Sequence, residues 1–484
     1  MKRKLAKILT VATLVLAILL VAVLGVGCGS VHVTSISEGQ GTGEYIVTYS
    51  DGTTQTLNLP GRDGKDGKDV TITDIYETYK KETGEDIAFT DFLDKYLTLE
   101  GKGADNSAVI ARCLNSVAKV YTEFVEQVAG AVWRPVYDIA VYTGSAVIWS
   151  IDASADGYTY MVTNAHVVHD SKAAYPNGGN IAKRVHCYLY GSESAPHTVD
   201  KDGDGRADSD AEGYTLYDYG DYGTECEIVG YSFEKDIAVI RAKTSALLAI
   251  NDDIRAVELA DGYHVGETAI AIGNPEDEGI SVTEGIVSID NENIELNIDT
   301  HRTYRSIRID TALYGGNSGG GLFNGDGKLI GIANAGSSED QNINYAVPLE
   351  IVRGTVENIL YWFGDGNDDT TGAYKIVMGV TVLSSGSKYV YDSSLGYGKI
   401  EENVTVQEIT SGSIASRFGI AVGDVITGVV VGSTTHEVKR NFDISDIILT
   451  MRPGDTIALT YTRDGVAARS AAVTLTVSDF TKIA

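Results

Sequence analysis

The sequence predicts a mostly β protein with several domains, and its length and residue patterns support this prediction. At 484 residues, the chain is long enough for two or three domains with cores of their own. Residues 108–363 contain many short β-branched runs separated by glycine, asparagine and aspartate, a spacing typical of an all-β barrel or sandwich. Residues 374–484 mix further strands with one expected helix at 411–420, and the glycine-rich segment 364–373 is expected to link the two domains.

The first 29 residues are expected to bring the chain to a membrane. A cationic start, "MKRKLAK", precedes twenty residues without a charge, "ILTVATLVLAILLVAVLGVG". Cys28 follows directly, and the segment resembles a bacterial lipoprotein signal, in which such a cysteine is acylated after cleavage. Gly25 departs from that signal, which prefers a leucine-like residue there, so lipidation of Cys28 and an uncleaved anchor both stay open. Either one places the rest of the chain at the extracytoplasmic face of the cell membrane.

Residues 30–107 are expected to form a stalk. The segment 44–59, "EYIVTYSDGTTQTLNL", alternates around Asp51-Gly52, which predicts a β-hairpin. The run "GRDGKDGKD" at 61–69 has glycine at every third position but no proline, so we expect a solvated linker and not a collagen triple helix. Two short helices are expected after it, at 73–82 and 90–99.

The net charge argues against one class of partner. Nucleic-acid binding requires a basic surface to meet phosphates, whereas this chain carries a formal charge of −29. We therefore expect no nucleic-acid partner, and the acidic residues are read as solvating the surface.

The segment "YGGNSGGGLF", from Tyr314 to Phe323, places one serine among five glycines. A glycine-rich run is usually a flexible turn. The alternative is that Ser318 is a nucleophile, because glycine neighbours leave backbone N–H groups open to an anion. A serine nucleophile needs a histidine base that a carboxylate holds in place.

Candidates for both partners precede the serine. His166 ends an apolar strand in "MVTNAHVV", and Asp236 opens the apolar strand "DIAVIRA", a setting that holds a carboxylate out of bulk water. Asp310 is the rival carboxylate, but it lies only eight residues before Ser318. "GNSGG" also fits the nucleophile elbow of α/β-hydrolases, in which the order is serine, acid, histidine. Here the order is His, Asp, Ser, which favours a chymotrypsin-type double β-barrel.

Several segments, taken in order, resemble the HtrA (DegP/DegS-like) trypsin-like serine proteases with a C-terminal PDZ domain. The segments that carry the resemblance are "TNAHVV" (163–168), "KDIAVIRA" (235–242), "AIGNP" (271–275), "TEGIVS" (283–288), "GNSGGGLFNGDGKLIGIANA" (316–335) and "NYAVPLEIV" (344–352). Each is weak alone, but the set is specific.

The resemblance implies a catalytic triad of His166, Asp236 and Ser318, with an oxyanion hole made by the backbone N–H groups of Gly316 and Ser318. It also implies that an extended substrate pairs with the strand Ile332, Ala333, Asn334, Ala335. The expected function is that of a serine endopeptidase acting on misfolded or exported polypeptides, without a catalytic cofactor. Homotrimers are common in the family, so a homotrimer is a further expectation.

One departure from the family is an inserted loop at about Gly191 to Gly223, which lengthens the spacing between His166 and Asp236. Within it, "DKDGDGRADSD" resembles extracellular calcium loops, and the expected calcium ligands are Asp200, Asp202, Asp204 and Asp208. The residue at the closing position of such a loop is Ala211, so calcium and a merely solvated acidic loop both stay open. A disulfide between Cys187 and Cys226, in two strand-like segments, also stays open.

The C-terminal block resembles a bacterial PDZ domain. "VMGVTV" (377–382), "GSIASRFGIAVGDVITGV" (412–429) and "PGDTIALTYTRDG" (453–465) carry the resemblance. It implies that peptide C-termini bind beside Met378, Gly379 and Val380. The alternative function for the whole chain is a catalytically silent surface protein that uses the PDZ groove as a binding scaffold.

Overall fold

The computed structural model describes residues 33–38, 44–49, 54–58, 80–81 and 106–483, the last range with gaps at 132–133, 175–179, 298–300, 337–339, 341, 365–371 and 394. It divides into two compact units, residues 1–108 and 109–484. Among the described residues, no helix has the length and apolar character that crossing a membrane requires. The membrane-targeting segment with Cys28 lies outside the described residues, as do the linker at 61–69 and, except for Lys80 and Lys81, the helices expected at 73–82 and 90–99.

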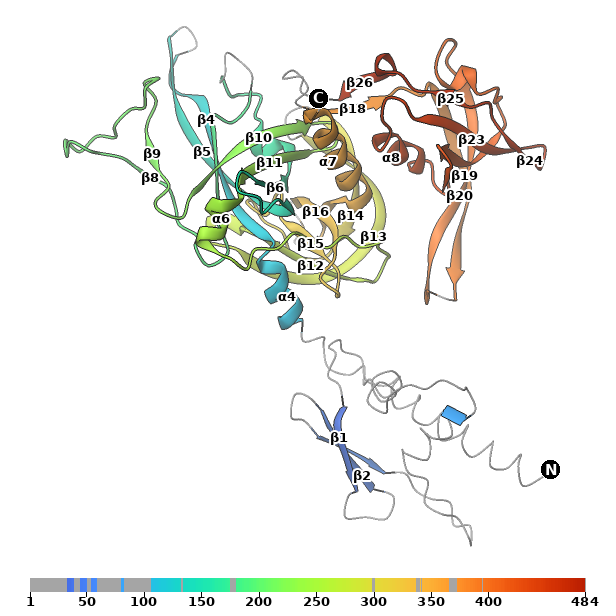
Figure 1. Cartoon of the computed structure of the whole chain (residues 1–484), viewed down its shortest axis with the longest axis horizontal. Helices are drawn as coiled ribbons and strands as arrows, with labels where there is room; N and C mark the ends of the chain where they lie inside the picture. Colours follow the sequence, from blue (N-terminus) through green and yellow to red (C-terminus); the bar gives the residue numbers. More distant parts are fainter. Residues whose placement is uncertain are drawn as a thin grey trace. The chain divides into compact units, whose positions relative to one another are not determined.

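The described part of the first unit contains a three-stranded sheet in the order β1-β2-β3 (Figure 1). Strands β2 (Glu44–Tyr49) and β3 (Thr54–Asn58) pair antiparallel and form the expected hairpin. Strand β1 (Val33–Glu38), which the sequence did not predict, adds to the other edge of β2.

The second unit begins with helix α4 (Ser107–Leu114, of which Val109 onward belongs to this unit) and a closed six-stranded barrel in the order β10-β11-β6-β5-β4-β7. Alternating apolar residues on each strand fill its interior, among them Val120, Ile148, Met161 and Ile240, all fully buried. The strands are β4 (Val117–Ala131), β5 (Arg134–Ile151), β6 (Tyr158–Thr163), β7 (Arg184–Leu189), β10 (Thr224–Ser232) and β11 (Ile237–Lys243).

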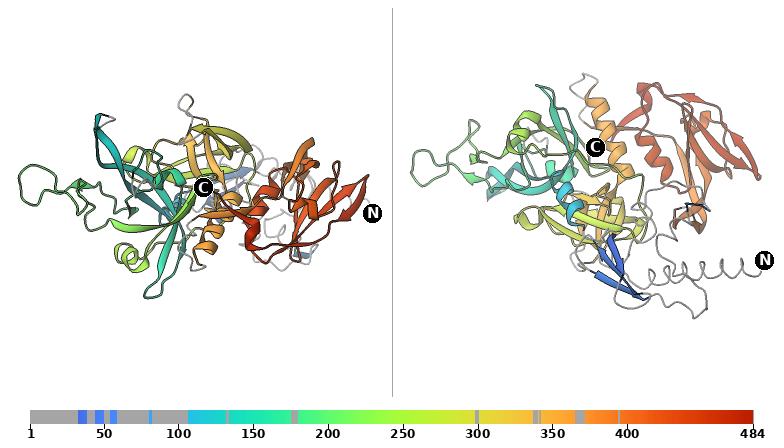
Figure 2. Two further views of the ribbon diagram at one scale, coloured as in Figure 1. Left: turned by 90° about the horizontal axis from the view of Figure 1, so that it is seen from above. Right: turned by 60° about the horizontal axis from the view of Figure 1, so that its bottom comes forward.

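A second closed barrel follows, in the order β12-β13-β14-β17-β16-β15. Helix α6 (Thr244–Ile250) precedes it, and the barrels can be followed from two further sides in Figure 2. The strands are β12 (Thr268–Gly273), β13 (Ser281–Asn297), β14 (His301–Ile309), β15 (Gly321–Phe323), β16 (Leu329–Gly336) and β17 (Asn344–Pro348). The predicted double β-barrel is therefore confirmed.

Helix α7 (Leu349–Phe363) is an exception to the all-β pattern expected for residues 108–363. Its β-branched residues fit a strand pattern locally, but they recur at helical spacing, and Ile351, Val352, Val356 and Ile359 are all buried. The helix packs against both barrels and also against the C-terminal block (Figure 1). It therefore connects the two parts of this unit.

The C-terminal block is a sheet in the order β19-β20-β21-β23-β24, with helix α8 (Asp443–Leu449) packed on the same apolar core. The helix expected at 411–420 is wrong in extent, because only the short turn η2 (Ala415–Arg417) forms there, between glycines at 412 and 419 with positive φ. The remaining elements are β18 (Ala373–Ile376), β19 (Val380–Asp392), β20 (Tyr397–Ile409), β21 (Val425–Val431), β22 (Thr434–Glu437), β23 (Thr456–Arg463), β24 (Val466–Arg469), β25 (Val473–Thr474), η3 (Val477–Asp479) and β26 (Phe480–Ile483).

A buried arginine ties this block to the second barrel. Arg305 on β14 donates hydrogen bonds to Glu350 of α7 at 2.9 Å and to Asp446 of α8 at 2.6 Å. Burial raises the pKa of Asp446 to about 7 despite the adjacent guanidinium. Since the side chain of Arg305 is only 8 % exposed, its two carboxylate partners are the contacts that compensate for its desolvation.

Candidate active site

His166 and Asp236 meet where β6 ends and β11 begins. His166 lies in the one-turn helix α5 (Ala165–Val168), directly after β6, and not on the strand itself. Its Nδ1 lies 2.9 Å from Oδ2 of Asp236, and its backbone N–H donates to Oδ1 at 3.1 Å. Asp236 is fully buried and adopts φ = 50° just before β11, a conformation in which the carboxylate faces the imidazole. The amide of Asn164 donates to the carbonyl of Asp236 at 2.9 Å and fixes this turn further.

This pairing sets the electrostatics of the imidazole. Burial alone would lower the pKa of His166, but the charge of Asp236 and its hydrogen bond raise it above its usual range. Because Nδ1 is engaged with Asp236, Nε2 is the nitrogen that remains for proton transfer.

The turn that carries Ser318 is bound to the first barrel by Ser145 on β5. The N–H of Ser145 donates to the carbonyl of Ser318 at 2.8 Å, and its Oγ donates to the carbonyl of Gly316, also at 2.8 Å. Next to it, a Cβ at Gly144 would lie 2.9 Å from the side chain of Val167 and 3.4 Å from the carbonyl of Ser318. The absence of a side chain at Gly144 thus lets the serine turn approach the residue that follows His166.

The hydroxyl of Ser318 has a different partner from the one expected. Its Oγ donates to the carbonyl of Asn334 at 3.2 Å, and the described residues show no hydrogen bond between Ser318 and His166. The Asn334 carbonyl belongs to strand β16, and the register of β16 against β17 shifts between Ala333 and Ala335. Asn334 is therefore the residue at a β-bulge, a feature that commonly re-aims backbone groups beside a site.

In the expected oxyanion loop, residues 315–318, the carbonyls of Gly315 and Gly316 are both hydrogen-bonded. The carbonyl of Gly315 accepts the N–H of Glu276, and that of Gly316 accepts Oγ of Ser145. Gly316 has φ = 97°, and a Cβ there would lie 2.2 Å from the carbonyl oxygen of Asn274, so only glycine fits. Within the described residues, the N–H groups of Gly316 and Ser318 have no protein acceptor. Two such N–H donors beside a nucleophile are what an oxyanion requires.

A pocket of about 390 Å³ adjoins Ser318. Within the described residues, no side chain that lines it carries a charge. It is lined by Leu313, Tyr314, Gly315, Asn317, Ser318, Ala333, Asn334, Ala335 and Gly336.

The expected substrate strand is shorter than the sequence indicated, which corrects the inclusion of Ile332 and Ala333. Ile332 pairs with Gly321 of β15 and with Val347 of β17, so both of its edges are used. Ala333 accepts the N–H of Gly319 and donates to the carbonyl of Gly320. Beyond it, β17 is the only described strand that pairs with β16, so residues 334–336 have an edge without a partner in the described part of the chain.

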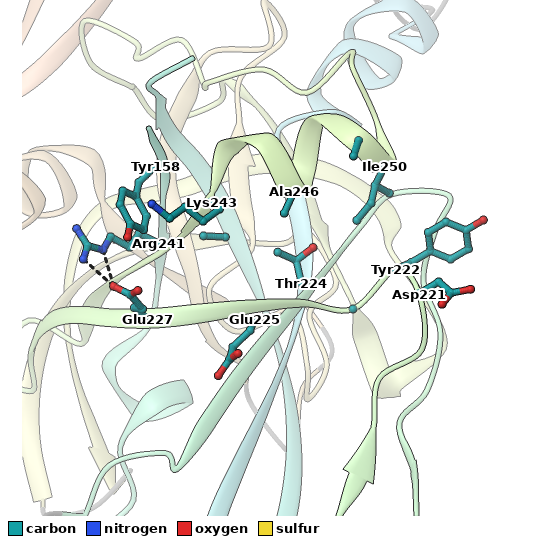
Figure 3. A pocket seen from close by; sticks show the side chains of 13 residues that line it. Tyr158, Asp221, Tyr222, Thr224, Glu225, Glu227, Arg241, Lys243, Ala246 and Ile250 are labelled. Atoms are coloured by element: carbon teal, nitrogen blue, oxygen red, sulfur yellow. Dashed lines mark hydrogen bonds and ion pairs between the residues drawn. The ribbon is translucent and has the colours of Figure 1, made fainter. Parts of the chain in front are cut away.

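Two other candidates are separate from this site. The rival carboxylate Asp310 is exposed and accepts the N–H of Ile286 at 2.7 Å, away from His166. A pocket of about 630 Å³, drawn in Figure 3, lies on the outer face of the first barrel. Arg241, ion-paired with Glu227, and Lys243 line it, and no predicted site residue does.

The inserted loop brings three of its four expected calcium ligands together. One carboxylate oxygen from each of Asp200, Asp202 and Asp204 lies within 4.8 Å of the others, and all three residues are exposed. Asp208 instead accepts the N–H of Lys201 at 2.9 Å. Three carboxylates suit a hard cation, so the residues fit calcium, with Asp208 outside the cluster.

Cys187 and Cys226 are free, buried thiols, so the disulfide that the sequence left open is not formed in this structure. They lie diagonally across β7 and β10, because Cys187 is opposite Thr224 and Cys226 is opposite Val185. Contact with Cys187, together with burial, raises the pKa of the Cys226 thiol well above its usual range. Such a thiol is unreactive.

The expected peptide-binding residues lie at the start of an edge strand. Among the described strands, β19 pairs only with β20, which leaves its other edge open along Val380. Gly379 has φ = 72°, and its carbonyl accepts the N–H of Thr410, while the carbonyl of Met378 accepts that of Ala415. Both carbonyls are thereby engaged within the domain.

Ser145, Asn164 and Asn274 support the site but were not predicted. Each is fully buried and hydrogen-bonded to a segment far away in the sequence: Ser145 to Ser318, Asn164 to Asp236, and Asn274, through its N–H, to Ser145. Asn164 stands within the segment "TNAHVV", whereas nothing in the residues around Ser145 marks it locally.

Calcium binding to the inserted loop stays a prediction, and thermal unfolding tests it. With millimolar calcium, we expect a higher unfolding midpoint than in chelator, because a cation that binds only the folded loop stabilises it by mass action. Asp202→Asn should remove that increase, whereas Asp156→Asn, an exposed aspartate outside the cluster, should retain it. An equal calcium response in wild type and Asp202→Asn would refute this site.

Comparison with known proteins agrees with this geometry. Residues 144–332 match the family model of the trypsin-like peptidase domain. The chain is similar to the serine protease Do-like HtrA of Lactococcus lactis subsp. lactis (28% identity over 252 residues, 50% of this chain and 58% of the relative). It is also similar to the probable periplasmic serine protease do/HhoA-like of Haemophilus influenzae (29% over 244 residues, 50% and 48%).

Among solved structures, it is similar to the HtrA-type protease AlgW with decapeptide, at 23% identity and a TM-score of 0.45, over 77% of this chain and 98% of that one. The chain spans about half the length of the curated relatives that it matches. Residues 144–332 thus match a trypsin-like peptidase domain, and the chain is similar to HtrA-type serine proteases over about half of its length.

Proposed function

We propose that this protein is a serine endopeptidase with His166, Asp236 and Ser318 as its catalytic residues. The observation that carries the proposal is the bond between Nδ1 of His166 and the buried Asp236, beside a serine turn bound to the same barrel by Ser145. A histidine–carboxylate pair next to a serine with open N–H donors is the arrangement that acyl transfer requires.

The reaction starts when the hydroxyl of Ser318 rotates away from the carbonyl of Asn334 toward Nε2 of His166. The imidazole takes the proton as Oγ bonds to the peptide carbonyl carbon, and Asp236 stabilises the imidazolium. The carbonyl oxygen becomes an anion facing the N–H groups of Gly316 and Ser318. His166 then protonates the leaving amine, and water repeats the sequence to release the acid and restore Ser318.

The substrate is an extended, unfolded segment of an exported polypeptide. The open edge at residues 334–336 allows a substrate strand to pair with β16, and this pairing engages main chain, which folded proteins do not present. The carbonyl of Asn334 is the acceptor for a substrate N–H once the Ser318 hydroxyl has left it. The pocket beside Ser318 receives the apolar side chain before the cut.

The C-terminal block acts as a PDZ domain that binds peptide C-termini. A peptide strand would add to the open edge of β19 and place its carboxylate beside Met378, Gly379 and Val380. Helix α8 forms the other wall, since Ile444 and Ile448 pack in the same core as Met378.

The protein works outside the cytoplasm, attached to the cell membrane through its first 29 residues, as a lipoprotein or by an uncleaved anchor. Support comes from the cationic and then apolar start of the sequence and from the periplasmic relative. Its role there is protein quality control, and a homotrimer stays a prediction.

An unfolded and a folded substrate test the proposed activity. We expect the ectodomain, residues 30–484, to cleave a substrate protein that has been reduced and alkylated. The native form of that substrate should remain intact, because the open edge of β16 binds only an extended chain. Ser318→Ala should lower kcat/KM by at least about 10³-fold, since the covalent step is lost. Equal, absent cleavage by wild type and Ser318→Ala, even with hydrophobic C-terminal peptides added, would favour the binding scaffold.

The pH profile tests the pairing of His166 with Asp236. Only neutral imidazole accepts the serine proton, so kcat/KM should rise with pH as His166 loses its proton. Because Asp236 raises the pKa of His166, we expect the midpoint above the usual value of about 6.5, with a plateau at higher pH. A midpoint clearly below that value would contradict the hydrogen-bonded pair.

A further inference from the structure

The turn that follows β12 supports the oxyanion loop directly. The N–H of Glu276 donates to the carbonyl of Gly315 at 2.6 Å. The carbonyl oxygen of Asn274 lies so near Gly316 that a Cβ on Gly316 would be only 2.2 Å from it. The orientation of the Gly315–Gly316 peptide is therefore defined by this turn. If Glu276 moved, the Gly315 carbonyl would lose its donor, and the N–H of Gly316 would be free to rotate out of the oxyanion hole.

The turn has a conformation that its own residues do not favour. Glu276 has φ = 50° and Asp277 has φ = 64°, and neither is glycine. Non-glycine residues keep a left-handed conformation only where surrounding contacts hold it. Within the turn, the N–H of Gly279 donates to Oδ1 of Asn274 at 2.9 Å and the N–H of Glu278 donates to the carbonyl of Pro275 at 3.0 Å, and a further contact reaches outside it.

Asp277 supplies that contact. Its carboxylate accepts a hydrogen bond from the hydroxyl of Tyr121 at 2.7 Å and pairs with Nζ of Lys119 at 2.8 Å. Both partners lie on β4 of the first barrel and are almost fully buried, and Lys119 also reaches the backbone carbonyl of Asp277 at 3.4 Å. The ammonium and the hydroxyl hold the carboxylate from two directions. A turn of the second barrel is thereby fixed to the wall of the first.

The inserted loop holds these partners in place. The ring of Tyr121 packs edge-on against Tyr188 at 5.9 Å and against Tyr219 of the insert at 6.2 Å. The hydroxyl of Tyr188 donates to the carbonyl of Tyr219, and the ring of Tyr219 stacks on His186 at 3.7 Å. The insert therefore packs against the ring of Tyr121, whose hydroxyl binds Asp277.

We propose that Asp277 is a positioning residue for hydrolysis: by binding Lys119 and Tyr121, it keeps the strained turn in the conformation that orients the N–H of Gly316 toward the oxyanion. This inference rests on the proposed function, because it concerns the rate of the same reaction. Asp277 does not touch the substrate. Its effect passes through Glu276 to Gly315.

Asp277→Asn tests the proposal with Glu278→Gln as its matched control. Asparagine tolerates positive φ as aspartate does, so the variant removes the charge and keeps the backbone preference. Glu278 lies in the same turn and is exposed, and its side chain has no recorded partner among the described residues. Because losing one oxyanion donor costs about 10²–10³-fold, we expect kcat to fall at least about tenfold in Asp277→Asn, with KM within about twofold of wild type. Glu278→Gln should match wild type in both constants.

A peptide aldehyde separates positioning from a general loss of stability. Its adduct with Ser318 carries the oxyanion, so its affinity should fall in Asp277→Asn by the same factor as kcat. A peptide that is not cleaved forms no oxyanion. It should therefore bind Ser318→Ala and the double variant Ser318→Ala/Asp277→Asn with equal affinity. If Asp277→Asn fails to fold, Tyr121→Phe, which removes only the hydroxyl, should show the same pattern to a smaller degree.

The outcomes distinguish this inference from the proposed function. Wild-type hydrolysis with equal kcat and equal aldehyde affinity in Asp277→Asn and Glu278→Gln would overturn the positioning role alone. Absence of hydrolysis in wild type would overturn the proposed function, and the positioning role with it.

Discussion

The arrangement of the site depends on one buried serine that is not the nucleophile. Ser145 lies on a strand of the first barrel, and its polar groups bind three segments of the chain. Its N–H holds the carbonyl of Ser318, its Oγ donates to Gly316 and accepts the N–H of Asn274, and its carbonyl accepts the hydroxyl of Thr163. All of these distances lie between 2.7 and 2.8 Å, and Ser145 has no exposed surface. A buried network in which each group has its partner is rigid, because leaving any one unpaired is costly.

This network, together with an apolar cluster to which strands of both barrels contribute, explains why the two barrels meet in one geometry. Each barrel is closed, so no strand crosses from one to the other. The hydrogen bonds of Ser145 and the close approach at Gly144 replace strand pairing at the seam. The first barrel contributes His166 and Asp236, and the second contributes Ser318. The separation between base and nucleophile is therefore a property of the seam and not of either barrel alone.

The sequence indicated the proposed catalytic residues more readily than the residues that hold the site in place. His166, Asp236 and Ser318 were predicted because the roles proposed for them need particular residue types in a particular order, and the glycines around Ser318 predicted the turn. The structure brings His166 and Asp236 into hydrogen-bonding contact. Helix α7 was missed because its β-branched residues fit a strand locally, although its buried residues recur at helical spacing. Ser145, Lys119 and Tyr121 were not identified because the residues of the second barrel that they bind lie more than 120 residues away. The extent of the substrate strand required the register of β15 against β16, which no local pattern contains.

Covalent labelling of the ectodomain with a fluorophosphonate, followed by mass spectrometry of the labelled peptide, tests the central claim most directly. The probe reacts with a serine only when a base has activated it and N–H donors face the phosphoryl oxygen. The account predicts a single adduct on Ser318 in wild type and at least about 10²-fold slower labelling in Asp236→Asn, in which the imidazole loses its orienting carboxylate. An adduct on another serine, or equal labelling rates in the two proteins, would contradict it.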